Sequence, residues 1–133
     1  MSIPPFQILL VFVGGGLGSV ARYLTTVIAL QLFGPQFPWG TFTVNVVGSA
    51  LMGFLTALIV ARWTPESGGT ELRLFLTTGI IGGFTTFSAY SLDAFVLWER
   101  GQMTSAVVYV LSSVVVSFAV LAAAMLATRA ALV

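Results

Sequence analysis

Residues 77–91 read Thr-Thr-Gly-Ile-Ile-Gly-Gly-Phe-Thr-Thr-Phe-Ser-Ala-Tyr-Ser, and this segment is the most informative part of the sequence. Three glycines and six serine or threonine residues lie inside an otherwise apolar segment. Gly82 and Gly83 predict a break at the centre of a helix, because glycine releases the backbone from helical geometry. Non-helical backbone persists in a bilayer only where protein, water or an ion satisfies it, and broken helices commonly form ion sites. This density of polar groups favours a functional break over hydroxyls that merely bond back to their own helix.

Composition places the whole chain in a membrane. Of its 133 residues, 58% are apolar and only 7% are charged, whereas a soluble domain carries about 25% charged residues. A water-facing surface cannot be built from this inventory. The sequence therefore predicts an all-α integral membrane protein, with residues 1–133 forming one transmembrane domain.

Four stretches are long and apolar enough to span a bilayer, which takes about 20 residues. Turn-rich or polar segments separate them, and the stretch before the first lacks the positive charge of a signal peptide, which indicates a retained helix. The predicted spans are residues 6–33, 41–61, 72–98 and 103–128.

Topology and assembly are less strongly encoded. An even number of spans puts both termini on one side, together with Arg62, Arg73 and Arg129, while Arg100 lies opposite. So few charges give a weak bias, and they are compatible with cytoplasmic termini or with insertion in both orientations. Small-xxx-small pairs in every span predict close helix packing. Because four helices cannot wall an aqueous pathway on all sides, a two-fold homodimer is expected.

The sequence has no cysteine, no histidine and no lysine. The usual general bases, nucleophiles and transition-metal ligands are therefore missing, and we do not expect an enzyme. A net charge of +1 provides no basic patch for nucleic acid.

Several side chains are candidates for contact with an anion. Phe87 and Tyr90 share a helix face, and the edges of aromatic rings carry partial positive charge. Asn45, near the start of the second span, either bonds a neighbouring helix or donates its amide to an anion. The residues alone do not separate these two readings.

A stripe of hydroxyl groups follows the last span. Tyr109, Ser113 and Ser117 recur at a spacing of four residues, so they lie on one helix face. They form either a polar track or a row of hydroxyls that bond back to the helix. Arg22 lies deep in the first span, where a cation usually faces a water-filled cavity or a partner.

The pattern in residues 38–48, Pro-Trp-Gly-Thr-Phe-Thr-Val-Asn-Val-Val-Gly, followed by Gly-Gly-Phe-Thr-Thr-Phe-Ser in residues 82–88, resembles the Fluc (CrcB-type) fluoride channel family. The resemblance extends over nearly the whole chain. It implies an antiparallel, dual-topology homodimer in the bacterial plasma membrane, with two pores that let fluoride leave the cytoplasm passively. It also implies a central sodium ion, structural and not transported, held by the backbone carbonyls of Gly82 and Thr85 from both subunits.

The same resemblance assigns roles to side chains. Arg22 corresponds to the vestibule arginine, and Tyr90 stands where phenylalanine is frequent, while Ala89 replaces a common hydroxyl residue. The implied fluoride-pore residues are Asn45, Phe87, Ser88, Tyr90, Tyr109, Ser113 and Ser117.

Two other classes remain as alternatives. A small proton-coupled multidrug antiporter also has four helices, but its mechanism needs a carboxylate in the first span, where this chain has Arg22 and no acid. A non-transporting assembly subunit or a membrane-embedded enzyme is the second alternative, and the missing histidine and cysteine disfavour most hydrolytic and metal chemistry.

Overall fold

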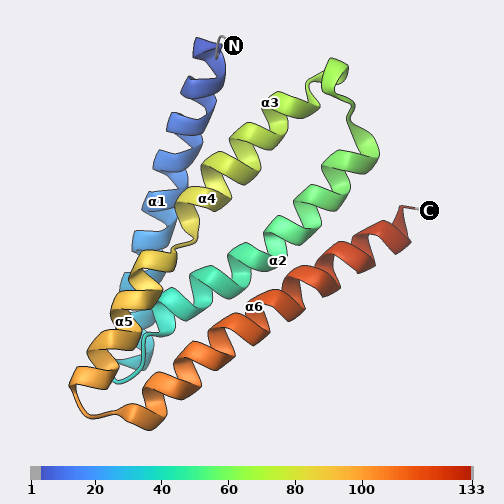
Figure 1. The fold of residues 1–133 in the computed structure, drawn as a ribbon. Helices are drawn as coiled ribbons and strands as arrows, with labels where there is room; N and C mark the ends of the chain where they lie inside the picture. The colour runs from blue at the N-terminus through green and yellow to red at the C-terminus, as the bar shows by residue number, and fades with distance from the viewer. Residues whose placement is uncertain (1–3, 133) are drawn as a thin grey trace.

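The computed structural model describes residues 4–132, and all of its regular elements there are helical (Figure 1). The terminal residues 1–3 and 133 of the predicted domain lie outside the described part. The elements are α1 (Pro5–Phe33), α2 (Trp39–Arg62), η1 (Pro65–Ser67), α3 (Gly69–Arg73), η2 (Leu74–Ile81), α4 (Gly82–Phe84), α5 (Phe87–Glu99) and α6 (Met103–Ala131).

Four helical spans within residues 4–132 are long and apolar enough to cross a membrane, which confirms that prediction. They are α1, α2, the composite segment Gly69–Glu99 and α6. Both termini lie toward the same end of the molecule, together with the connection between α2 and α3 (Figure 1). Gly34, with a φ of 74°, ends α1 in a conformation that a side chain would disfavour.

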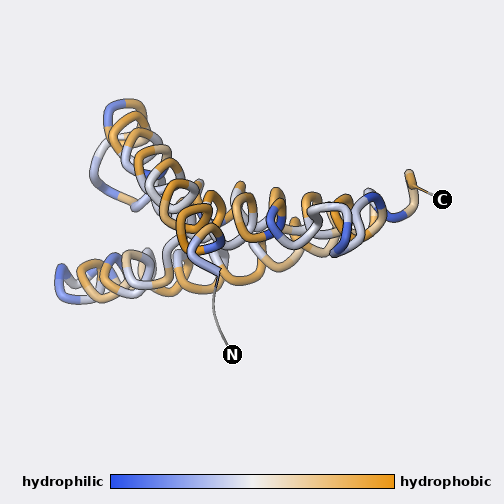
Figure 2. Tube along the Cα trace, turned by 90° about the horizontal axis from the view of Figure 1, so that it is seen from above, coloured by the Kyte–Doolittle hydropathy of each residue, from blue (hydrophilic) through white to orange (hydrophobic). Residues whose placement is uncertain are grey.

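The spans form an open arrangement. Helix α2 packs along α6, while α1 packs against η2 and α4, and the view from above shows arms that spread apart (Figure 2). Only 6% to 28% of each span's most apolar window is buried within the chain. The remaining apolar surface therefore requires lipid or another protein to cover it.

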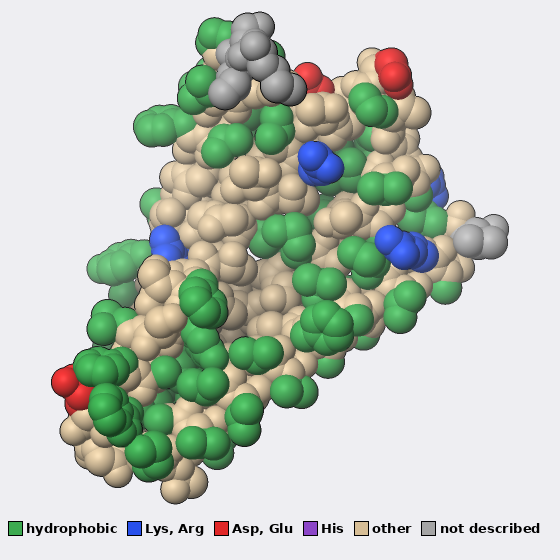
Figure 3. Space-filling view, in the orientation of Figure 1, with side chains coloured by type: hydrophobic (Ala, Val, Ile, Leu, Met, Phe, Trp, Pro, Cys, Tyr) green, Lys and Arg blue, Asp and Glu red, His purple; other side chains and the backbone are tan. Residues whose placement is uncertain are grey.

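Apolar residues dominate the helices, and hydrophilic residues lie mostly near their ends (Figure 2). On the face shown in Figure 3, charged side chains are sparse, and most of them lie toward the end that carries the termini. Trp39 and Trp98 are 40% and 52% exposed near the opposite turns. Such tryptophans are typical of membrane–water interfaces, so this distribution fits a chain that crosses the bilayer.

Glycine lets α1 approach the third span at backbone contact. A side chain at Gly14 would meet Gly79 Cα at 3.0 Å, and one at Gly18 would collide with the carbonyl oxygen of Ile80. Gly83 packs in the same way against Gly15. The small residues predicted to favour close packing are thus the contact points between these two spans.

The third span is a π-helix over η2, and its helical backbone is interrupted at a different place from the one predicted. Gly82 and Gly83 lie in the short helix α4, and Gly82 has helical angles (φ −62°, ψ −36°). The backbone is extended instead at Thr85 (φ −80°, ψ 158°) and Thr86 (φ −154°, ψ 124°). Of the two glycines, Gly83 is the one in close contact with α1, while Thr86 has side-chain partners that can replace helical hydrogen bonds.

Candidate functional site

A cavity of about 470 Å³ lies where α2, the extended residues and α6 meet. Its lining combines carbonyls, hydroxyls, an amide and aromatic rings. Seven of the predicted site residues line it: Asn45, Gly82, Thr85, Phe87, Tyr90, Ser113 and Ser117. The fold therefore brings together residues from the second, third and fourth spans that are up to 72 positions apart, from 45 to 117.

The side chain of Asn45 forms two hydrogen bonds with the extended backbone of Thr86. Its Oδ1 accepts the N–H of Thr86 at 2.9 Å, and its Nδ2 donates to the Thr86 carbonyl at 3.0 Å. The residue therefore does bond a neighbouring span, which was one of the two readings of the sequence. An amide nitrogen has two N–H groups, and the bond to the Thr86 carbonyl uses one of them.

Thr86 also starts the next helix. Its hydroxyl oxygen accepts the N–H of Ala89 at 3.2 Å, which is the bond expected of an N-cap threonine. The same hydroxyl lies 3.2 Å from the hydroxyl of Ser88. Helix α5 thus begins in a fixed direction, with Phe87 as its first residue.

These bonds affect two carbonyl groups. In an unbroken α-helix, the N–H of Thr86 would bond the Gly82 carbonyl, and that of Ala89 the Thr85 carbonyl. Here both N–H groups donate instead to side chains, those of Asn45 and Thr86. The Gly82 and Thr85 carbonyl oxygens therefore do not receive the hydrogen bonds that a continuous helix would supply.

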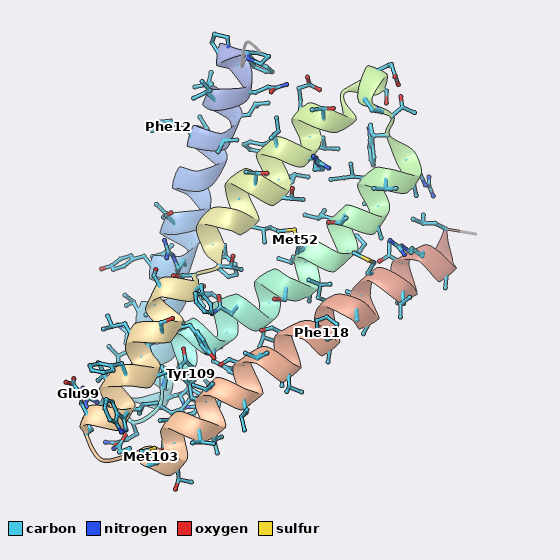
Figure 4. The ribbon with its side chains drawn as sticks, in the orientation of Figure 1. Phe12, Met52, Glu99, Met103, Tyr109 and Phe118 are labelled. Atoms are coloured by element: carbon cyan, nitrogen blue, oxygen red, sulfur yellow. The ribbon has the colours of Figure 1, made fainter. Side chains whose placement is uncertain are left out.

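An aromatic row leads away from the cavity. The Phe87 and Tyr90 rings lie 5.4 Å apart between centroids, and Tyr90 lies 5.4 Å from Tyr109. Phe87 is 78% exposed, whereas Tyr109 is fully buried and points from α6 toward the neighbouring spans (Figure 4). The Tyr90 hydroxyl donates to the Val110 carbonyl at 3.3 Å, so it ties α5 to α6.

Hydroxyl groups on α6 are available for a ligand. The Oγ atoms of Ser113 and Ser117 are buried and have no hydrogen-bond partner among the described residues. Ser112, which falls off their stripe, donates to the Tyr109 carbonyl at 3.4 Å. A buried hydroxyl without a partner is costly, and a ligand in the cavity would relieve this cost.

Three predicted residues lie beside the cavity or away from it. Ser88 is exposed near its rim, and the Tyr109 hydroxyl donates to Oδ2 of Asp93 at 3.3 Å. Arg22 lies on α1, where its guanidinium is 3.5 Å from the Ser19 hydroxyl. Arg22 is not among the residues that line the cavity.

Sequence reasoning missed some residues of the site. Ser49 and Met52 on α2 line the cavity, and Met52 lies on the side of α2 that faces α4 (Figure 4). Thr86 was the more consequential omission, because its backbone bonds the Asn45 side chain and its hydroxyl caps helix α5. A threonine that precedes an aromatic helical run is an N-cap signal, and this signal could have identified it.

Comparison with known proteins agrees with this architecture. The family model described as "CrcB-like protein, Camphor Resistance (CrcB)" matches residues 9–125. The chain therefore belongs to the CrcB family, as its resemblance predicted.

Curated relatives share about half of their residues with it. A fluoride-specific ion channel FluC of Mesorhizobium japonicum is 53% identical over 110 residues, which cover 83% of this chain and 86% of the relative. The protein of the same name from Agrobacterium fabrum is 52% identical over 113 residues, covering 85% and 88%. The one from Rhizobium etli is 48% identical over 124 residues, covering 93% and 97%. These relatives are bacterial ion channels by name, which confirms that the chain is a multi-pass protein of the bacterial cell membrane and not an enzyme.

Proposed function

We propose that this protein is a fluoride-selective channel that lets fluoride leave the cytoplasm passively and so reduces its toxicity. The observation that carries the proposal is the cavity, in which an amide and two buried hydroxyls without a partner in residues 4–132 converge beside the exposed ring of Phe87. Relatives about 50% identical over most of the chain are named fluoride-specific ion channels, which supports the same conclusion.

Selectivity follows from the size of the ion. Fluoride is small and strongly hydrated, so its passage requires closely placed donors that replace water. The second amide N–H of Asn45 and the hydroxyls of Ser113 and Ser117 are such donors, and the Phe87 ring edge adds partial positive charge. Chloride is larger and accepts weaker hydrogen bonds. A narrow, donor-lined path therefore excludes it through pore size and lining groups.

Passive transport is sufficient for protection. Hydrogen fluoride enters a cell from acidic surroundings, ionises in the neutral cytoplasm and is trapped there as the anion. A channel lets that anion leave down its electrochemical gradient. The sequence contains no nucleotide-binding motif, and its first span has no acidic residue. We therefore do not expect fluoride movement to be coupled to another energy source.

The working unit in this proposal is an antiparallel homodimer with two pores. Phe87 is 78% exposed although it lines the cavity, so a single subunit leaves the pathway without a wall on that side. A second copy supplies the missing wall, and two-fold symmetry then produces two equivalent pathways. Arg22, which does not line the cavity of its own subunit, serves in this arrangement as a vestibule residue that attracts anions.

A structural sodium ion fits the donor set at the extended residues. The carbonyl oxygens of Gly82 and Thr85 lack the bonds that a continuous helix would give them, and hard cations prefer oxygen ligands. With two copies, these carbonyls would hold the ion between the subunits. The bound ion would supply positive charge that fixes the two third spans to each other.

The experiment that separates this proposal from an antiporter is fluoride efflux from liposomes containing only this protein. A channel releases fluoride when a potassium ionophore balances the charge, with equal pH on both sides. If release instead required a pH gradient, a proton-coupled exchanger would replace the channel. If correctly assembled protein released no fluoride under either condition, a non-transporting subunit would be the better description.

A further inference from the structure

Two side chains keep the third span from closing into a continuous helix. Oδ1 of Asn45 accepts a hydrogen bond from the N–H of Thr86, at 2.9 Å. The Thr86 hydroxyl oxygen accepts one from the N–H of Ala89, at 3.2 Å. These are the two N–H groups that would otherwise bond the Gly82 and Thr85 carbonyls. For each carbonyl proposed to bind sodium, one side chain therefore accepts the hydrogen bond that the carbonyl would receive in a continuous helix.

We propose that Thr86 is a positioning residue whose hydroxyl keeps the Thr85 carbonyl available for the cation, while Asn45 does the same for the Gly82 carbonyl. This inference rests on the proposed function and its sodium site. Thr86 itself contributes no atom to the ion. It acts through the helix cap, and the cap in turn sets where Phe87 enters the cavity.

The surroundings of Thr86 hold its hydroxyl in place. The side chain is 9% exposed, and the Ser88 hydroxyl lies 3.2 Å away, which limits the directions that the Thr86 hydroxyl can take. On the other side, a side chain at Gly48 would collide with Cγ2 of Thr85. Glycine at position 48 therefore lets α2 approach the extended residues closely enough for Asn45 to reach Thr86.

Loss of the hydroxyl has a defined consequence. Without its acceptor, the Ala89 N–H can turn to the Thr85 carbonyl, as in a regular helix. That carbonyl would then be shared between an N–H group and the cation. We expect weaker sodium binding and a displaced Phe87 ring, with the cavity residues of α2 and α6 unchanged.

The test compares Thr86→Val, which keeps the shape and removes the hydroxyl, with Thr86→Ser, which restores it. Thr77→Val is the matched control, because Thr77 is 8% exposed in the same span and its hydroxyl donates back to the Arg73 carbonyl, at 2.7 Å. For each purified protein, the sodium concentration that half-maximally raises the thermal unfolding temperature is measured. Hydrogen exchange at the Ala89 amide reports the cap, and fluoride efflux is recorded in parallel.

We expect Thr86→Val to need about five-fold more sodium, the effect of a lost N-cap bond. Its efflux should fall and its Ala89 amide should exchange differently from that of the wild type. Thr86→Ser should return the sodium requirement to within about two-fold of the wild type, and Thr77→Val should match it. Should the valine fit poorly, Thr86→Ala tests the same loss without added bulk.

Several outcomes overturn the inference. An unchanged sodium requirement in Thr86→Val and Thr86→Ala, or an equal defect in Thr86→Ser, would show that the hydroxyl does not govern the site. So would an equal defect in Thr77→Val, or wild-type protein that is indifferent to sodium. Failure of the proposed function is distinct, because it would appear as wild-type liposomes that release no fluoride.

Discussion

The side chain of Tyr90 performs two separate tasks. Its ring contacts those of Phe87 and Tyr109 in tilted arrangements, with centroids 5.4 Å from each, while its hydroxyl donates to the Val110 carbonyl on α6. The hydroxyl therefore points to a backbone partner. In this position it strengthens the contact between α5 and α6, and the ring provides the surface beside the cavity.

Replacing Tyr90 with phenylalanine should separate these tasks. The ring stays, so fluoride efflux should remain within about two-fold of the wild type, while loss of one hydrogen bond in the membrane should lower stability by about 0.6 kcal/mol. Efflux from liposomes and unfolding in detergent measure the two effects. An efflux loss as deep as that of a ring deletion would place the hydroxyl in the pathway.

The Phe87 ring is expected to be indispensable for transport. Phe87→Ile removes the ring edge from the cavity at a position that is 78% exposed within one subunit, so little packing inside that subunit is lost. We expect fluoride efflux to fall to background while the protein still elutes as the wild-type oligomer. Efflux at the wild-type rate would remove the aromatic edge from the mechanism.

Single residues were only partly predictable. Phe87, Tyr90 and the serines of α6 could be nominated because helical spacing alone puts them on common faces. The bonds of Asn45 could not be foreseen, because its partner Thr86 lies 41 positions away and is available only after the backbone has left helical geometry. For the same reason, the released carbonyls of Gly82 and Thr85 have no signature in the side-chain inventory.

At the scale of helices, the contact between α1 and the third span depends on the absence of side chains. Gly18→Val should separate these spans, because even a Cβ atom would collide with the Ile80 carbonyl oxygen, and backbone cannot yield as a side chain can. We expect little folded protein on size-exclusion chromatography. Gly16→Val is the control, since a Cβ there meets nothing within 4 Å; equal behaviour of the two variants would contradict this contact.

Helix positions followed readily from the sequence, and the irregular residues did not. Apolar runs and turn segments located all four spans, because lipid demands about 20 apolar residues for each. The break was expected at Gly82 and Gly83, but the extended residues are Thr85 and Thr86. Glycine permits an irregular backbone without requiring one, whereas the amide of Asn45 and the cap of Thr86 supply bonds that stabilise it.

At the scale of the whole molecule, the proposed antiparallel dimer requires the chain to insert in both directions. The few arginines give only a slight directional preference, which suits such insertion. A cysteine added next to either terminus should be labelled by an impermeant reagent from both faces of the membrane. Labelling from one face alone would contradict the antiparallel arrangement, and it would leave the cavity within each subunit unaffected.

Assembly is the level that one chain reveals least. Only 6% to 28% of the apolar window of each span is buried within the chain. The rest of this apolar surface is therefore expected to be covered by lipid or by a second subunit. Lipid and a second subunit are both apolar, however, so hydrophobicity does not divide the surface between them. The exposed Phe87 beside a polar cavity is the feature that distinguishes the pathway side from the lipid-facing sides.

The central claim is that the donors in this cavity replace the water around fluoride and do so poorly for larger halides. The most direct test is passive efflux of fluoride and of chloride from liposomes that contain only the purified protein, at equal pH and with charge balanced by an ionophore. We expect rapid fluoride release, with chloride release at the background rate. Equal rates for the two anions would show that the donors in the cavity do not select fluoride.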